Sequence, residues 1–181
     1  MRRNAVAIII TLAYPFVVSF GLGAFSPRAM AVVLGVVMLV RLSTAKDAAG
    51  VWWLAGAGLL ILAVVVSNKA LPLKLYPALV NAGLLALFGW GLYRPPTVVE
   101  RIARRRHPDL PPAAVAYTRR VTIIWCVFFV VNGLIALETA LWETPAVWSL
   151  YNGFIAYILM GVVFAGEWVV RQRVMRVHNA A

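Results

Sequence analysis

Two long apolar runs flank a basic segment, residues 94–120, that carries seven of the chain's 17 lysines and arginines. A helix needs about 20 apolar residues to cross the hydrocarbon core of a bilayer. Lysine and arginine concentrate in the short loops that stay on the cytoplasmic side of a membrane. The arrangement therefore predicts an integral membrane protein in which residues 94–120 form a cytoplasmic loop.

The composition agrees with this interpretation, because 63% of the residues are hydrophobic and only 13% are charged. Soluble domains are typically about half apolar and roughly a quarter charged. A net charge of +11 would suggest a nucleic-acid partner in a soluble protein. In a chain this apolar we interpret it as the charge bias of cytoplasmic loops, and we expect no nucleic-acid partner.

Six apolar runs are candidates for membrane-spanning helices. Strands of a membrane barrel would be about 10 residues long with strict alternation, whereas these runs are longer and apolar on all sides. We therefore predict an all-α fold, a polytopic helical bundle in which residues 1–181 form a single transmembrane domain. The predicted spans are residues 5–24, 28–42, 48–67, 75–93, 121–141 and 146–170.

The orientation follows from the distribution of basic residues over six spans. With the N-terminus inside, only Arg28, Lys69 and Lys74 lie outside. Both termini are then cytoplasmic. We expect Lys69 and Lys74 to snorkel toward the outer headgroups. Aromatic residues near the span ends, Trp148 among them, are typical of a belt at the membrane interface.

The basic loop contains the pattern of a helix start. Thr97 and Glu100 form the T-x-x-E capping box, in which each side chain bonds the backbone amide of the other residue. This predicts a short amphipathic helix over residues 98–106, with Glu100 paired to Arg104 one turn on. Pro108 then ends the helix, and a new helix starts near Pro112.

Three interpretations of this loop remain open. It can be an interfacial helix on anionic lipid headgroups, a docking surface for cytoplasmic biosynthetic proteins or a phosphate-bearing substrate, or a solvated loop that only sets topology. We favour the interfacial helix because of the capping box. The candidate binding residues are Arg101, Arg104, Arg105, Arg106, Arg119 and Arg120.

The main polar residues within the predicted spans are Asn81, Asn132, Asn152 and Glu167. Such groups are costly in lipid and usually face the bundle interior with partners. They can form a substrate site, with Glu167 as a proton or cation group. They can instead join helices by hydrogen bonds, with Glu167 paired to Arg171. For each residue taken alone we favour the packing interpretation.

No motif for catalysis or for a cofactor is present. The two histidines, His107 and His178, lie in separate segments, and a metal site needs several ligands at suitable spacing. The Walker A, nucleophile-elbow and G-x-G-x-x-G patterns are missing. The sequence thus predicts no metal site, no cofactor and no catalytic residue, although an intramembrane enzyme that uses Glu167 or His107 is kept as a third hypothesis.

Several motifs resemble an uncharacterised family of small proteobacterial inner-membrane proteins. They are K-L-Y-P-x-x-V-N, R-P-P-x-x-x-E-R-x-A-R and Y-T-R-x-x-T within residues 71–133, and Y-N-G with a following G-E within residues 148–171. The resemblance implies the bacterial inner membrane. It also implies genes for a ketosynthase, an acyltransferase and an exporter of aryl-polyene-type lipids nearby. The family has no assigned activity, so the resemblance implies no reaction and no catalytic residues for this chain. It favours an accessory or scaffold protein for lipid or polyketide biosynthesis or export, with a small transporter or flippase of an acyl or lipid-linked substrate as the alternative.

Overall fold

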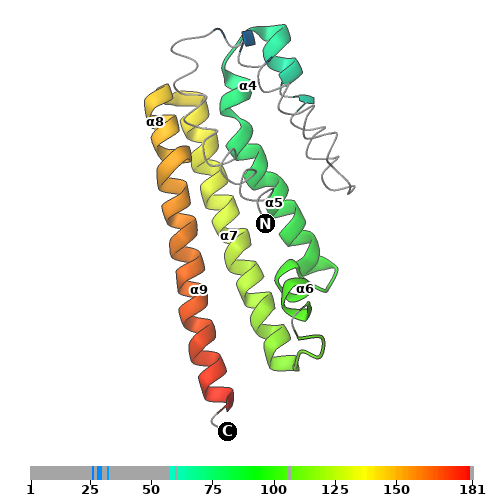
Figure 1. Cartoon of the computed structure of the whole chain (residues 1–181). Helices are drawn as coiled ribbons and strands as arrows, with labels where there is room; N and C mark the ends of the chain where they lie inside the picture. The colour runs from blue at the N-terminus through cyan, green and yellow to red at the C-terminus, as the bar shows by residue number, and fades with distance from the viewer. Residues whose placement is uncertain are drawn as a thin grey trace. The chain divides into compact units, whose positions relative to one another are not determined.

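A computed structural model of the protein describes residues 26, 28, 29, 32, 58, 59, 61–105 and 107–179, with side chains up to residue 172. Throughout these ranges the regular elements are helices and no strand occurs, which confirms the all-α prediction (Figure 1). The predicted span 5–24, and most of the predicted spans 28–42 and 48–67, lie outside the described residues. The number of six spans therefore stays a prediction.

Among the described residues, three helical segments are long and apolar enough to cross a membrane, and they correspond to the last three predicted spans. The first is α5 (Tyr76–Tyr93) and the second is α7 (Pro112–Trp142). The third, Pro145–Gln172, is assembled from α8 (Pro145–Leu150), a π-helical turn η1 (Tyr151–Ile155) and α9 (Ala156–Asn179). Two short helices complete this part of the chain, α4 (Leu71–Lys74) and α6 (Val98–Arg104).

The chain divides into two compact units, which are described separately. Unit 1 comprises Met1–Pro77 and Ala136–Phe154, and unit 2 comprises Ala78–Ile135 and Ile155–Ala181. Each unit has its own apolar cluster. The cluster of unit 1 contains Val64, Leu73, Ala140 and Trp148, and that of unit 2 is built on Val121, Trp125 and Phe129.

Trp148 is the centre of unit 1. Its side chain is 0% exposed, and its indole Nε1 donates a hydrogen bond of 2.9 Å to the carbonyl oxygen of Lys74. The prediction that Trp148 belongs to an interfacial belt is therefore wrong. Thr144 is the N-cap of α8, its hydroxyl accepts a hydrogen bond from the amide of Val147, and Trp148 follows in the first turns of this helix.

Lys74 also differs from its prediction. Its side chain is only 8% exposed, and its Nζ donates to the carbonyl oxygen of Glu143 at 2.9 Å instead of snorkelling toward headgroups. The ammonium thus caps the C-terminal end of α7, where carbonyls have no partner within the helix and attract a positive charge. A local hydropathy pattern cannot reveal this contact, because the two residues are far apart in the sequence.

The buried Lys74 makes the stability of unit 1 depend on pH. Burial lowers the pKa of Lys74 below its ordinary value of 10.5, and the negative charge of Glu143 opposes this only in part. Between the lowered pKa and 10.5, the unfolded chain binds more protons at this position than the folded chain. The free energy of unfolding should therefore rise as pH increases through this window.

The measurement is the difference in unfolding free energy between the wild type and Lys74→Met across a pH series in detergent. This difference should move in favour of the wild type as pH approaches 10.5. A difference that is flat or that falls with pH would contradict the expected direction.

Unit 2 is held by aromatic side chains from three helices. The rings of Trp125 and Phe164 have centroids 4.5 Å apart, and those of Phe88 and Phe129 meet edge to face at 5.2 Å. Such pairs contribute about 0.5–1.5 kcal/mol beyond their burial. Gly133 allows α7 to approach α5, because a Cβ built on it would lie only 3.0 Å from the Cβ of Asn81.

Candidate functional site

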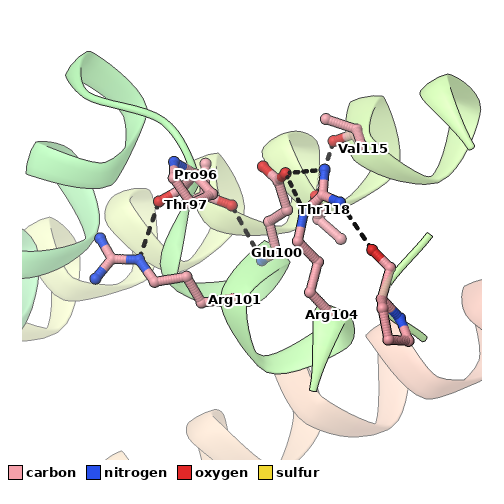
Figure 2. Close-up of polar contacts among 8 residues, drawn as sticks. Pro96, Thr97, Glu100, Arg101, Arg104, Val115 and Thr118 are labelled. Carbon is pink, nitrogen blue, oxygen red and sulfur yellow. Dashed lines mark hydrogen bonds and ion pairs between the residues drawn. The ribbon is translucent and has the colours of Figure 1, made fainter. Parts of the chain in front are cut away.

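The basic loop, residues 94–120, has a defined fold. α6 starts at Thr97, whose Oγ1 accepts a hydrogen bond of 3.2 Å from the amide of Glu100 (Figure 2). Thr97 is buried, and a Cβ built on Gly91 would lie 3.1 Å from its Cα, so a side chain at position 91 would have to displace this backbone. The predicted N-cap is confirmed, and the end of α5 lies directly against it.

The carboxylate of Glu100 is buried and paired with Arg104. The Oε1 atom of Glu100 lies 2.8 Å from Nη2 and 2.9 Å from Nε of Arg104, as the spacing predicts (Figure 2). In this part of the loop the carboxylate therefore faces Arg104, and the reciprocal half of the predicted capping box, a bond to the amide of Thr97, is not formed. α6 also ends earlier than predicted, at Arg104.

Three arginines use their side chains to bind backbone carbonyls of the loop or of the end of α5. Arg101 Nε donates to Pro96 at 3.1 Å, and Arg104 Nη1 donates to Pro108 at 3.0 Å (Figure 2). Arg119 Nη1 donates to the carbonyl of Leu92 at 3.2 Å, at the end of α5, where a cation complements the helix dipole. These three residues were predicted as binding residues, and the structure gives each of them a role in holding the loop.

Arg105 and Arg120 differ from the other three. Both are exposed, and within the described ranges neither side chain has a hydrogen bond or an ion pair. Arg106 lies outside the described residues. A guanidinium carries five donors in a planar fork that fits carboxylate and phosphate oxygens. The guanidinium donors of Arg105 and Arg120 are therefore exposed and unused within the described part of the chain.

Aromatic residues stand beside the loop at the end of α5. Trp90 is 60% and Tyr93 is 73% exposed, and the guanidinium carbon of Arg94 lies 6.0 Å and 5.7 Å from the centroids of their rings. Ile102 on α6 is exposed as well. Exposed aromatic and basic residues together are typical of the headgroup level of a membrane.

The predicted polar residues of unit 2 form hydrogen bonds with other polar side chains of the same unit. Asn132 Nδ2 donates to Asn81 Oδ1 at 3.1 Å, so the structure brings two of the four predicted residues into direct contact. Glu167 accepts from the hydroxyl of Tyr117, at 3.3 Å to Oε1 and 3.2 Å to its backbone oxygen. No ion pair joins Glu167 to Arg171 among the described side chains, contrary to the pairing that the packing interpretation assumed.

Sequence reasoning missed the role of Tyr117. Its only local signal is its position within the Y-T-R-x-x-T pattern, on the face of α7 that carries the buried Thr118 and Val121. The same face continues through Trp125, Phe129 and Asn132, which recur at helical spacing and are all buried.

Asn152 belongs to unit 1 and lies in η1. Its Nδ2 donates to the hydroxyl of Thr139 at 3.2 Å and to the carbonyl of Trp148 at 2.9 Å. The hydroxyl of Thr139 in turn donates to the carbonyl of Ala136. A chain of hydrogen bonds therefore links Thr139, Asn152 and Trp148 to Lys74.

Within the described residues no three His, Cys, Asp or Glu side chains gather in a way that could hold a metal ion. Comparison with known proteins finds no matching family model, no matching curated protein and no matching solved structure. The relation to the inner-membrane family therefore stays a prediction, which rests on the sequence motifs alone.

Proposed function

We propose that this chain is a non-catalytic accessory protein of a bacterial inner membrane, and that its basic loop binds an acidic surface on cytoplasmic proteins of lipid or polyketide biosynthesis or export. The proposal rests on one observation: some arginines of the loop bond to the protein itself, and others have no bond in its described part. Arg101, Arg104 and Arg119 are engaged with the loop itself, whereas Arg105 and Arg120 are exposed and unengaged in the described part of the chain.

A loop that is already folded favours binding, because less conformational entropy is lost when a partner docks. The Thr97 cap, the Glu100–Arg104 ion pair and the three capped carbonyls all restrict this loop before any partner arrives. A loop that served only to set topology would need its charges but none of these contacts.

The exposed aromatic pair supports a location at the headgroups. Trp90, Tyr93 and Arg94 would hold the end of α5 at the membrane surface, with anionic headgroups near Arg94. Arg105 and Arg120 would then face a partner that approaches from the cytoplasm. Electrostatic attraction of this kind weakens as salt screens it.

The test is the double variant Arg105→Gln/Arg120→Gln. Hydrogen bonds to charged groups contribute about 1.5–3 kcal/mol each, so co-purification with the ketosynthase and acyltransferase of the same cells should fall by at least about tenfold. The variant should still insert and fold, because neither side chain has a contact within the described part of the protein.

The matched control is Lys69→Gln/Arg171→Gln, which removes the same charge from two exposed residues outside the loop. It should leave co-purification unchanged. Retained co-purification of the loop variant, or an equal loss in the control, would reject the proposal.

The alternative is a small transporter or flippase for an acyl or lipid-linked substrate. One observation supports this alternative: polar side chains are buried or half-buried on apolar helices. They are Asn81, Asn132, Asn152 and Glu167. Deletion of the gene followed by lipid profiling separates the two functions. Lost synthesis supports an accessory role, whereas finished product trapped in the inner leaflet supports transport.

A further inference from the structure

One buried polar atom of unit 1 has no partner in the described part of the protein. Asn152 is 4% exposed, and its Oδ1 accepts no hydrogen bond there, while its Nδ2 makes two. Buried polar atoms in native proteins nearly always have a partner. Leaving such an acceptor unsatisfied costs about 1–3 kcal/mol.

The orientation of this amide is set by its neighbours. The carbonyl oxygen of Trp148 can only accept, so the atom 2.9 Å away from it must be the amide nitrogen of Asn152. Exchanging the two amide atoms would place two acceptors against each other. Oδ1 is therefore the atom that lacks a donor.

The adjacent donors are already in use. The hydroxyl proton of Thr139 goes to the carbonyl of Ala136, and the indole Nε1 of Trp148 goes to Lys74. Neither can turn to Oδ1 without giving up its own bond. The donor must come from elsewhere.

The surroundings restrict the chemistry of that donor. Trp148 and Ala140 are part of an apolar cluster, and burying a cation beside it would cost far more than burying a neutral group. The π-helical turn η1 that carries Asn152 is a second, independent observation, since such turns are rare and occur frequently at functional sites.

We propose that Asn152 Oδ1, presented by the π-helical turn, is a binding site for a neutral hydroxyl donor, supplied by a buried water or by the hydroxyl group of a lipid. This site is separate from the basic loop and does not depend on the function proposed above. A bound hydroxyl would complete the chain of hydrogen bonds that runs from Thr139 through Asn152 and Trp148 to Lys74.

The first measurement asks whether Oδ1 is bonded. Protein with ¹³C-labelled asparagine side chains is reconstituted in vesicles of phosphatidylcholine and phosphatidylglycerol, which supply both water and a lipid hydroxyl, and the infrared carbonyl band of Asn152 is isolated as wild type minus Asn152→Leu. The band should lie at the lowered frequency of a bonded amide, as the band of Asn81 should, because Asn81 Oδ1 accepts from Asn132. A band at the frequency of a free amide would overturn the proposal.

The second measurement identifies the source and uses only the wild-type protein, so it does not depend on the folding of a variant. Polarisation transfer from water to the Asn152 side-chain amide is recorded by solid-state NMR in phosphatidylcholine vesicles, whose lipids have no hydroxyl donor, and in vesicles with added phosphatidylglycerol. Transfer in both supports a buried water. A shift of the amide signal only with phosphatidylglycerol supports a lipid hydroxyl. A bonded carbonyl that responds to neither indicates a donor from the protein itself and would also overturn the proposal.

Discussion

Replacing Trp148 with alanine should lower the free energy of unfolding by about 3–5 kcal/mol, the range for removing a large buried aromatic side chain. Trp148 is fully buried among Val64, Leu73 and Ala140, and it bonds the carbonyl of Lys74. The substitution leaves a cavity and also an unpaired carbonyl. Unfolding of the detergent-solubilised protein, followed by tryptophan fluorescence or circular dichroism, measures the loss.

Two further variants separate the causes. Trp148→Phe keeps most of the apolar volume but removes the indole donor, so it should cost about 1–3 kcal/mol for the unsatisfied carbonyl. Trp142→Ala is the control, because Trp142 is among the most exposed aromatic residues of the described chain, and it should change stability little. If Trp148→Ala and Trp142→Ala had similar effects, the buried position of Trp148 would be wrong.

The second large effect is expected at Gly133. Gly133→Ala should destabilise the protein by about 1–3 kcal/mol, the usual cost of overpacking. The added Cβ would lie 3.0 Å from the Cβ of Asn81, tighter than most Cβ contacts in proteins, and Asn81 is held by its bond to Asn132. One of the two must move, and the helix contact or the hydrogen bond is lost.

Gly161→Ala provides the matched control. Gly161 is also a helical glycine, but a Cβ there has nothing within 4 Å. The same substitution should therefore be neutral or slightly stabilising, since alanine favours helix more than glycine does. Equal destabilisation at both positions would show that helix propensity, and not the contact with Asn81, determines the result.

Local patterns in the sequence were enough to predict several features. The apolar runs 75–93, 121–141 and 146–170 predicted helices, because a chain in lipid must satisfy its backbone groups internally. Thr97 predicted the start of α6 and Glu100 the pairing with Arg104, since both contacts span one helical turn.

Other features depended on contacts between residues far apart in the chain. Lys74 was expected at the headgroups, but its position is decided by Glu143 and Trp148, which no spacing rule connects to it. The pairing of Tyr117 with Glu167 is of the same kind. In the loop, Arg101, Arg105 and Arg119 look equivalent in sequence, and only the folded backbone determines which of them meet a carbonyl.

The basic loop illustrates the difference between features that local sequence determines and features that only tertiary contacts decide. The sequence by itself determined that a charged segment with a capped helix separates two membrane-length helices, because charge bias and capping act over a few residues. Only the tertiary structure decided that Arg101, Arg104 and Arg119 stabilise the loop while Arg105 and Arg120 stay available, and that Asn152 keeps one acceptor open. The physical reason is that a hydrogen bond depends on where its partner lies in space, and that position is set by the packing of the helices.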